Sequence, residues 1–96
     1  MTIERRLTTP DRRDALRDKR IELAILLFDG QSETWRAYGC FPGGADEYRI
    51  ASPVGHGSTA SAAIDDLIRM KVSVATGLHV AAWALGWIVG PIVTGG

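Results

Sequence analysis

The sequence TWRAYGCFPGGADEYRIA, residues 34–51, predicts a β-hairpin. Side chains alternate in character along residues 34–41, which is typical of a strand with two different faces. Residues 42–46, PGGAD, have the composition of a turn, so that residues 47–51 return antiparallel as a short second strand. One face of the first strand then carries Trp35, Ala37, Gly39 and Phe41, and the other carries Arg36, Tyr38 and Cys40.

The hairpin face opposite Trp35 and Phe41 is the surface at which we expect a partner to bind. Arg36, Tyr38 and Arg49 are expected to share this face. Tyr and Arg are residue types that anchor protein interfaces and also stack on single-stranded bases. Because three residues are few, a plain solvated sheet face is the alternative interpretation.

The chain before the hairpin predicts a helix and then a strand. Residues 9–11, Thr-Pro-Asp, supply an N-cap hydroxyl, a proline for the first turn and an acid for the positive end of the helix dipole. We expect the helix to run to about Arg20. Residues 21–28, IELAILLF, are then a strand that ends at a hairpin-type Asp-Gly dipeptide. A helix that continues beyond Arg20 is the competing interpretation.

After the hairpin, residues 55–59, GHGST, lead into a second helix. Ser58 or Thr59 is expected to be its N-cap. Free amides at such a helix start attract phosphate, but the stretch lacks the lysine and the glycine spacing of a phosphate-binding loop. A plain turn and cap is therefore the expectation. The apolar stripe of this helix consists of Ile64, Leu67 and Ile68.

Residues 48–64, YRIASPVGHGSTASAAI, resemble the strand, glycine turn and Thr-capped helix of HicB-like antitoxins and of many small phage proteins. Those domains form a small sheet backed by helices and bind a protein partner without catalysis. The resemblance therefore implies a non-enzymatic binding role. The family commonly has Glu at the third helical position, where this chain has Ala62. No DNA-binding segment is recognised after the helix, so a repressor role is not implied.

The tail, residues 72–96, has no Asp, Glu, Lys or Arg. It predicts an apolar C-terminal helix that continues from the second helix. Residues 72–90 in helical form would span roughly 28 Å, which is near the thickness of the bilayer hydrocarbon. Its stripe of small residues includes a G-x-x-x-G spacing, which lets helix backbones approach closely. The residues expected to pack against another helix or a second copy are Ala82, Trp83, Gly86, Trp87 and Gly90.

Two environments remain open for this tail. It is either buried in protein, where it completes a thin core or pairs with a second copy, or it anchors the chain in a membrane through residues 72–93. Basic residues before the tail agree with a cytoplasmic N-terminal side. His79 and the hydroxyl residues make a membrane span costly. We therefore expect a cytoplasmic protein, with a single-span protein of the inner membrane as the alternative.

Composition restricts the function further. The 96 residues fit one domain, residues 1–96, and the 11 basic residues balance the 11 acidic ones. A nucleic-acid partner is therefore not expected. The one cysteine, Cys40, forms no internal disulfide, and with only two histidines no zinc spacing is present.

Catalysis is not expected either. Cys40 would need His56 or His79 as a base and a third orienting group, and nothing in the sequence brings them together. We expect no enzyme, cofactor or metal. The predicted fold is α+β, with a small antiparallel sheet of two to three strands, an N-terminal helix, a second helix from about residue 59 and the apolar C-terminal helix. The predicted function is a non-enzymatic protein-protein interaction module of a phage or mobile element, which inhibits or adapts a larger host protein in an anti-defence or antitoxin-like role.

Overall fold

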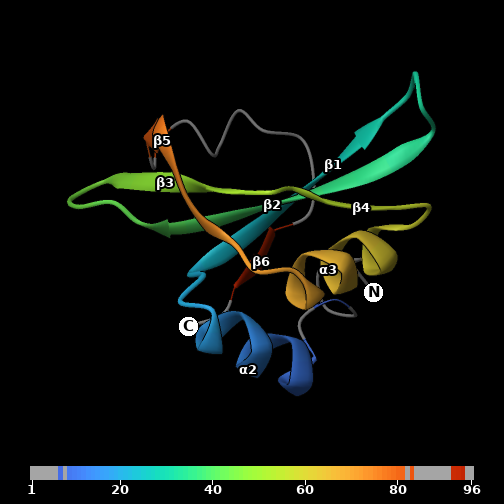
Figure 1. The fold of residues 1–96 in the computed structure, drawn as a ribbon, viewed down its shortest axis with the longest axis horizontal. Coiled ribbons are helices and arrows are strands. Elements are labelled where there is room, and N and C mark those ends of the chain that lie inside the picture. Colours follow the sequence, from blue (N-terminus) through green and yellow to red (C-terminus); the bar gives the residue numbers. More distant parts are fainter. Residues whose placement is uncertain (1–6, 8, 82, 84–91, 95–96) are drawn as a thin grey trace.

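The computed structural model describes residues 7, 9–81, 83 and 92–94. Within them it contains two α-helices and one antiparallel sheet, so the predicted α+β class is confirmed. Figure 1 shows the sheet above the two helices. The elements are α2 (Pro10–Asp18), β1 (Leu23–Asp29), β2 (Thr34–Pro42), β3 (Glu47–Ser52), β4 (Gly55–Gly57), α3 (Ala60–Arg69), β5 (Ser73–Ala81) and β6 (Ile92–Thr94).

The sheet has six strands rather than the predicted two to three, in the order β5-β3-β2-β1-β6, with β4 also paired to β2. The predicted β2–β3 hairpin is confirmed, and its register pairs Phe41 with Arg49. β3 pairs with one end of β2, at Cys40–Pro42, and β4 pairs with the other end, at Trp35–Ala37. The strand β2 is therefore the centre of the sheet.

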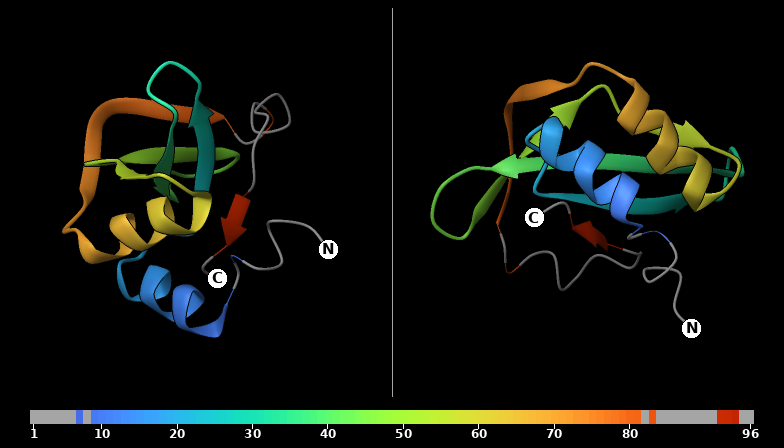
Figure 2. Two further views of the ribbon diagram at one scale, coloured as in Figure 1. Left: turned by 90° about the vertical axis from the view of Figure 1, so that its right-hand side faces the viewer. Right: turned by 90° about the horizontal axis from the view of Figure 1, so that it is seen from below.

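Both helices pack on the same face of the sheet (Figure 2). Thr9 accepts a hydrogen bond from Arg12 N at 3.3 Å and Thr59 accepts one from Ala62 N at 3.1 Å, so the predicted N-caps are confirmed and Thr59 rather than Ser58 caps α3. The core lies between the helices and the sheet. Its buried members are Leu7, Leu16, Ile21, Ala24, Leu26, Ala37, Ala60, Ala63, Ile64 and Leu67.

The first helix ends where the sequence left two alternatives. Ile21 N donates to Leu16 O at 2.9 Å and Arg20 N donates to Arg17 O at 2.9 Å, which is the Schellman pattern. Arg20 has φ 62°, the left-handed conformation that this ending requires. The chain then enters β1, which confirms the predicted helix to about Arg20 followed by a strand.

The predicted glycine turn before α3 is wrong. Gly55–Gly57 is the strand β4, and α3 lies directly against it. A Cβ atom on Gly55 would come 2.5 Å from Ala63 O, and one on Gly57 would come 2.5 Å from Ala63 N. These two glycines therefore exist to let a strand and a helix approach closely, which is one of the recognised uses of glycine in strands.

The predicted apolar C-terminal helix is also wrong over the described residues. Helix α3 ends at Arg69, and Ser73–Ala81 is the strand β5, paired with β3. The segment is rich in β-branched residues and contains Gly77, and both features weaken a helix. Residues 73–81 therefore pair with β3 as a strand and do not continue the helix. Within the part of the chain that the structure describes, no helix is long and apolar enough to cross a membrane.

Of the residues expected to mediate helix packing, only Trp83 is described, and it is 74% exposed. Ala82, Gly86, Trp87 and Gly90 lie outside the described residues. The second described piece of the tail is β6, which pairs with Leu23–Ile25 of β1. The two described strands of the tail thus lie at opposite edges of the sheet.

Candidate protein-contact surface

The sheet face opposite α2 and α3, called the distal face below, is defined by the β1–β2 register. Residues directly opposite one another in an antiparallel pair point to the same side. The register pairs Leu23 with Cys40 and Ile25 with Tyr38. Leu23, Ile25 and Cys40 are buried, and they form the centre of a second apolar cluster. Partly buried side chains that surround this centre are Leu27, Tyr38, Tyr48 and Ile50.

Arg36 extends the distal face toward the tip of the β1–β2 hairpin. It pairs with Leu27 across the strands, and its Nη2 donates to Asp29 Oδ2 at 2.9 Å. Its side chain is 43% exposed. Its Nε is enclosed and has no hydrogen-bond partner among the described residues. The guanidinium is thus held by Asp29 through Nη2 and also interacts with the Tyr38 hydroxyl, whereas Nε has no partner among the described residues.

Asp29 holds Arg36 because a tight turn organises the carboxylate. Asp29 Oδ1 accepts from Gln31 N at 3.0 Å and Oδ2 accepts from Ser32 Oγ at 2.9 Å. The Ser32 hydroxyl, the Gln31 amide and, more weakly, Arg36 lower the pKa of Asp29. The phenol of Tyr38, followed by Asp29, raises the pKa of Arg36. The carboxylate and guanidinium therefore both stay charged, and Tyr38 belongs to the same cluster.

The structure brings together Arg36 and Tyr38 but not Arg49. Arg49 lies directly opposite Phe41 on β2 and opposite His79 on β5. Phe41 packs against the helix-side core, so Arg49 projects from the helix side of the sheet. The expectation that Arg49 shares a face with Arg36 is wrong. The turn after Phe41 sets the register between β2 and β3. In this register the odd-numbered residues of both strands, such as Phe41 and Arg49, project from the same side of the sheet.

Asp29 is the member of this cluster that the sequence analysis missed as a site residue. The signal was present, because Asp29-Gly30 followed by Ser32 is typical of an Asx-type turn. What the pattern did not indicate is that Arg36, seven residues later, reaches back across the hairpin to the same carboxylate.

The candidate nucleophile Cys40 has no catalytic surroundings. It is fully buried, and this burial raises the pKa of its thiol to about 11. His79 lies on the helix side of the sheet and contacts Glu47 through Nδ1 and Oε1. His56 is exposed on β4. The described residues therefore contain no cysteine–histidine pair, and no group of metal-ligating side chains is present among them.

The GHGST stretch offers no free anion-binding amide at His56. His56 N donates to Asp66 Oδ2 at 2.9 Å, so a carboxylate of α3 already occupies this donor. Arg69 Nη2 also donates to Asp66, at 3.2 Å. Of the expected turn and cap, the cap is present at Thr59, whereas residues 55–57 form the strand β4 in place of a turn.

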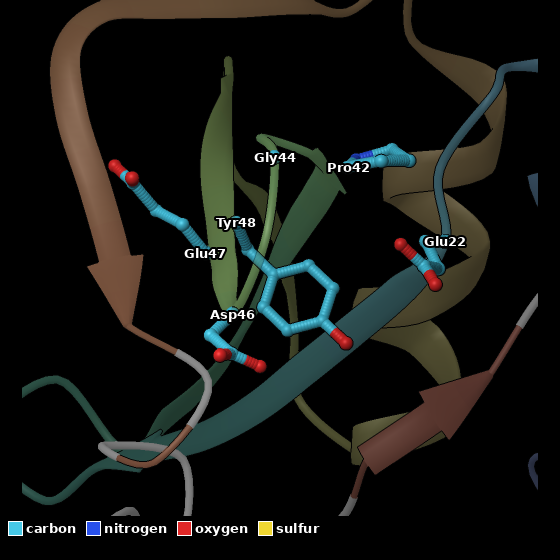
Figure 3. Close-up of a pocket in the computed structure, with 6 residues that line it drawn as sticks. All are labelled: Glu22, Pro42, Gly44, Asp46, Glu47 and Tyr48. Carbon is cyan, nitrogen blue, oxygen red and sulfur yellow. The ribbon is translucent and has the colours of Figure 1, made fainter.

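A shallow pocket of about 160 Å³ lies at the other end of the hairpin. In Figure 3 the Tyr48 ring stands between Asp46 and Glu22, and Glu47 points away from it. The Glu47 carboxylate contacts the imidazole of His79. The carboxylates of Glu22 and Asp46 give the pocket a negative potential. The described side chains around it are not arranged so as to bind a particular ligand. Its lining residues are Glu22, Pro42, Gly44, Asp46, Glu47 and Tyr48.

The function of the chain has to be inferred from the geometry of the distal face, because known proteins offer no match. No protein-family model matches the chain. No curated protein is significantly similar to it, and no solved structure matches it significantly. The resemblance of residues 48–64 to HicB-like antitoxins and small phage proteins therefore stays a prediction from the sequence.

Proposed function

We propose that this chain is a non-enzymatic protein-binding module that acts in the cytoplasm. Its contact surface is the part of the distal face around Arg36 and Tyr38. The observation that carries the proposal is the Asp29–Arg36–Tyr38 cluster, in which a half-exposed guanidinium is fixed by one carboxylate beside a phenol. Arg and Tyr are the residue types that dominate the binding energy of protein interfaces.

The fixed position of Arg36 supports a binding role over a purely solvated one. A long side chain loses conformational entropy when it is ordered at an interface. Asp29 has already restricted Arg36, and the hydrogen bonds from Gln31 and Ser32 restrict Asp29 in turn. A partner that contacts this guanidinium therefore meets a side chain whose ordering cost is reduced. The buried apolar centre at Leu23, Ile25 and Cys40 gives the surface a rigid base.

We further propose that the bound partner is a larger host protein and that the module inhibits or adapts it, as a phage or mobile-element protein of antitoxin type would. Two of the three parts of the motif resemblance over residues 48–64, the strand β3 and the Thr59-capped helix α3, support this assignment; the glycine turn is not among them. The membrane-anchored alternative required a helix over residues 72–90. Because Ser73–Ala81 is a strand, that basis is lost and we do not propose it.

The proposal is tested by affinity capture in the native host cell with tagged wild-type protein, R36A and Y38A. We expect a partner held by the wild type to be lost or reduced at least about tenfold with either variant, because anchor residues carry about 2 kcal/mol or more. R13A, at an exposed position of α2, is the matched control and should retain the partner. Undiminished capture by both R36A and Y38A would refute the surface.

A further inference from the structure

His56 lies beside the contact surface, on the strand β4 that neighbours Arg36. The register of β2 with β4 pairs Arg36 directly with His56. Side chains opposite one another in an antiparallel pair point to the same side of the sheet, with Cβ atoms about 4.5–5.5 Å apart. His56 is exposed, so its imidazole lies on the distal face beside Arg36.

The two glycines that flank His56 agree with this orientation. Gly55 and Gly57 face α3, because a Cβ atom on either of them would lie 2.5 Å from a backbone atom of Ala63. Successive side chains of a strand point to opposite faces, so His56 points away from α3. The same close packing fixes the backbone of β4 against the helix, which lies beneath this strand in Figure 1.

A carboxylate of α3 holds the backbone of His56 a second time. His56 N donates to Asp66 Oδ2 at 2.9 Å, and Arg69 Nη2 donates to Oδ1 of the same carboxylate at 3.2 Å. The imidazole forms no hydrogen bond with the described residues. The chain therefore presents a ring whose nitrogens form hydrogen bonds, on a backbone that is ordered before any partner binds.

We propose that His56 is a third anchor of the contact surface, with Arg36 and Tyr38, and that the region of the host protein bound there is uncharged. This inference rests on the proposed function, because it adds a contact residue and a partner chemistry to the same surface. The three side chains occupy neighbouring positions of β2 and β4 on one face. They form a continuous strip of guanidinium, phenol and imidazole.

The charges around His56 favour an uncharged partner region. Arg36 is bonded to Asp29, and these two charges balance. Arg69 is bonded to Asp66 in the same way. A charged group of a partner would therefore compete with one of these contacts. Hydrogen-bonding and aromatic groups meet the phenol and the imidazole while both pairs stay intact.

Capture in the native host cell tests the contact residue against a matched histidine. H56A removes an imidazole from the distal face, whereas H79A removes an exposed one from the helix side. We expect H56A to reduce capture of the partner at least about fivefold, the effect of losing a contact of moderate strength, and H79A to retain it. If H56A captures undiminished while R36A and Y38A fail, this inference is overturned and the proposed function stands. Undiminished capture by all three variants overturns both.

Crosslinking shows whether the same partner reaches both strands. A photoreactive amino acid replaces Tyr38, His56 or His79 in separate chains, and mass spectrometry identifies each adduct. We expect position 56 to trap the same protein as position 38, and position 79 to trap none. No adduct at position 56, or a protein different from the one at position 38, overturns the assignment of His56.

Salt tests the chemistry of the partner region. Added salt weakens contacts between exposed charges and has little effect on uncharged ones. We expect the amount of partner that the wild type captures to fall less than about threefold between roughly 0.05 and 0.5 M sodium chloride. A larger fall shows that the partner meets the surface with charged groups, which overturns the uncharged region.

Discussion

The two faces of the sheet are built differently. On the helix side, α3 touches the backbone of β4 at Gly55 and Gly57, and small and aliphatic side chains fill the remaining space. On the distal face, a small buried centre is surrounded by partly exposed aromatic, aliphatic and charged residues. Most of the buried apolar contacts therefore lie on the helix side, and the distal face contributes fewer of them.

The largest effect is expected where helix and strand backbones meet. In G57A, the added methyl would lie 2.5 Å from Ala63 N and 2.6 Å from the Ala62 carbonyl carbon, and backbone atoms have little room to move. We expect a loss of about 3 kcal/mol or more in the free energy of unfolding, at or above the usual cost of overpacking. Urea denaturation measures it.

G30A is the matched control for that glycine substitution. The nearest atom to an added methyl on Gly30 is a ring carbon of Phe28 at 4.0 Å, so there is space for it. We expect a change within about 0.5 kcal/mol, as for ordinary surface substitutions. Similar losses for G57A and G30A would show that the close approach of α3 is not what requires glycine.

A core residue and a residue of the distal face are expected to differ in how much their loss destabilises the fold. Leu67 is fully buried under the sheet, whereas Tyr38 is partly exposed. L67A should destabilise by about 2–5 kcal/mol, the range for buried leucines. Y38A should cost less than half as much while it abolishes partner capture. If Y38A destabilised the fold as much as L67A, the distal face would be structural rather than a binding surface.

A smaller effect is expected from the ion pair that joins the helices. Arg12 Nε and Nη2 donate to the two carboxylate oxygens of Asp65 at 2.9 and 3.0 Å. Because Asp65 is half exposed, the coupling energy in a double-mutant cycle of R12A and D65A should be about 0.5–1 kcal/mol. High salt should reduce it. A coupling near zero would mean that core contacts alone hold α2 to α3.

The smallest effect concerns the Asp66 carboxylate. The His56 amide and then Arg69 lower its pKa in the folded state. The stabilisation is therefore complete above the unfolded pKa, about 3.9, and is lost as the pH falls through the lower folded value. D66N retains an acceptor but should flatten this acid limb of the stability curve. D18N, which removes an exposed charge from α2, is the control and should leave the limb in place.

Local signals in the sequence were sufficient for several elements. The alternation over residues 34–41 and the turn at 42–46 predicted the β2–β3 hairpin, and Thr9 and Thr59 predicted the helix starts. The end of α2 was ambiguous because its left-handed residue is Arg20, where glycine would have marked the end clearly. The backbone hydrogen bonds at Leu16 and Arg17, rather than composition, fix it.

The errors arose where distant parts of the chain decide the structure. The uncharged stretch at 73–81 is a strand because β3 provides an edge, and hydrophobicity alone does not distinguish a strand from a helix. Gly55 and Gly57 looked like a turn because the approach of α3 is a tertiary contact. Arg49 was placed on the wrong face because the turn sets the register between β2 and β3, and a shift of one residue reverses every side chain.

Site-specific photo-crosslinking in the native host cell decides whether a partner binds at the distal face. A photoreactive amino acid replaces Tyr38 on the distal face or Arg13 on α2, and both variants are irradiated. We expect one discrete heavier adduct from position 38, diminished when R36A is added, and no such adduct from position 13. An adduct confined to position 13, or none at position 38, would contradict it.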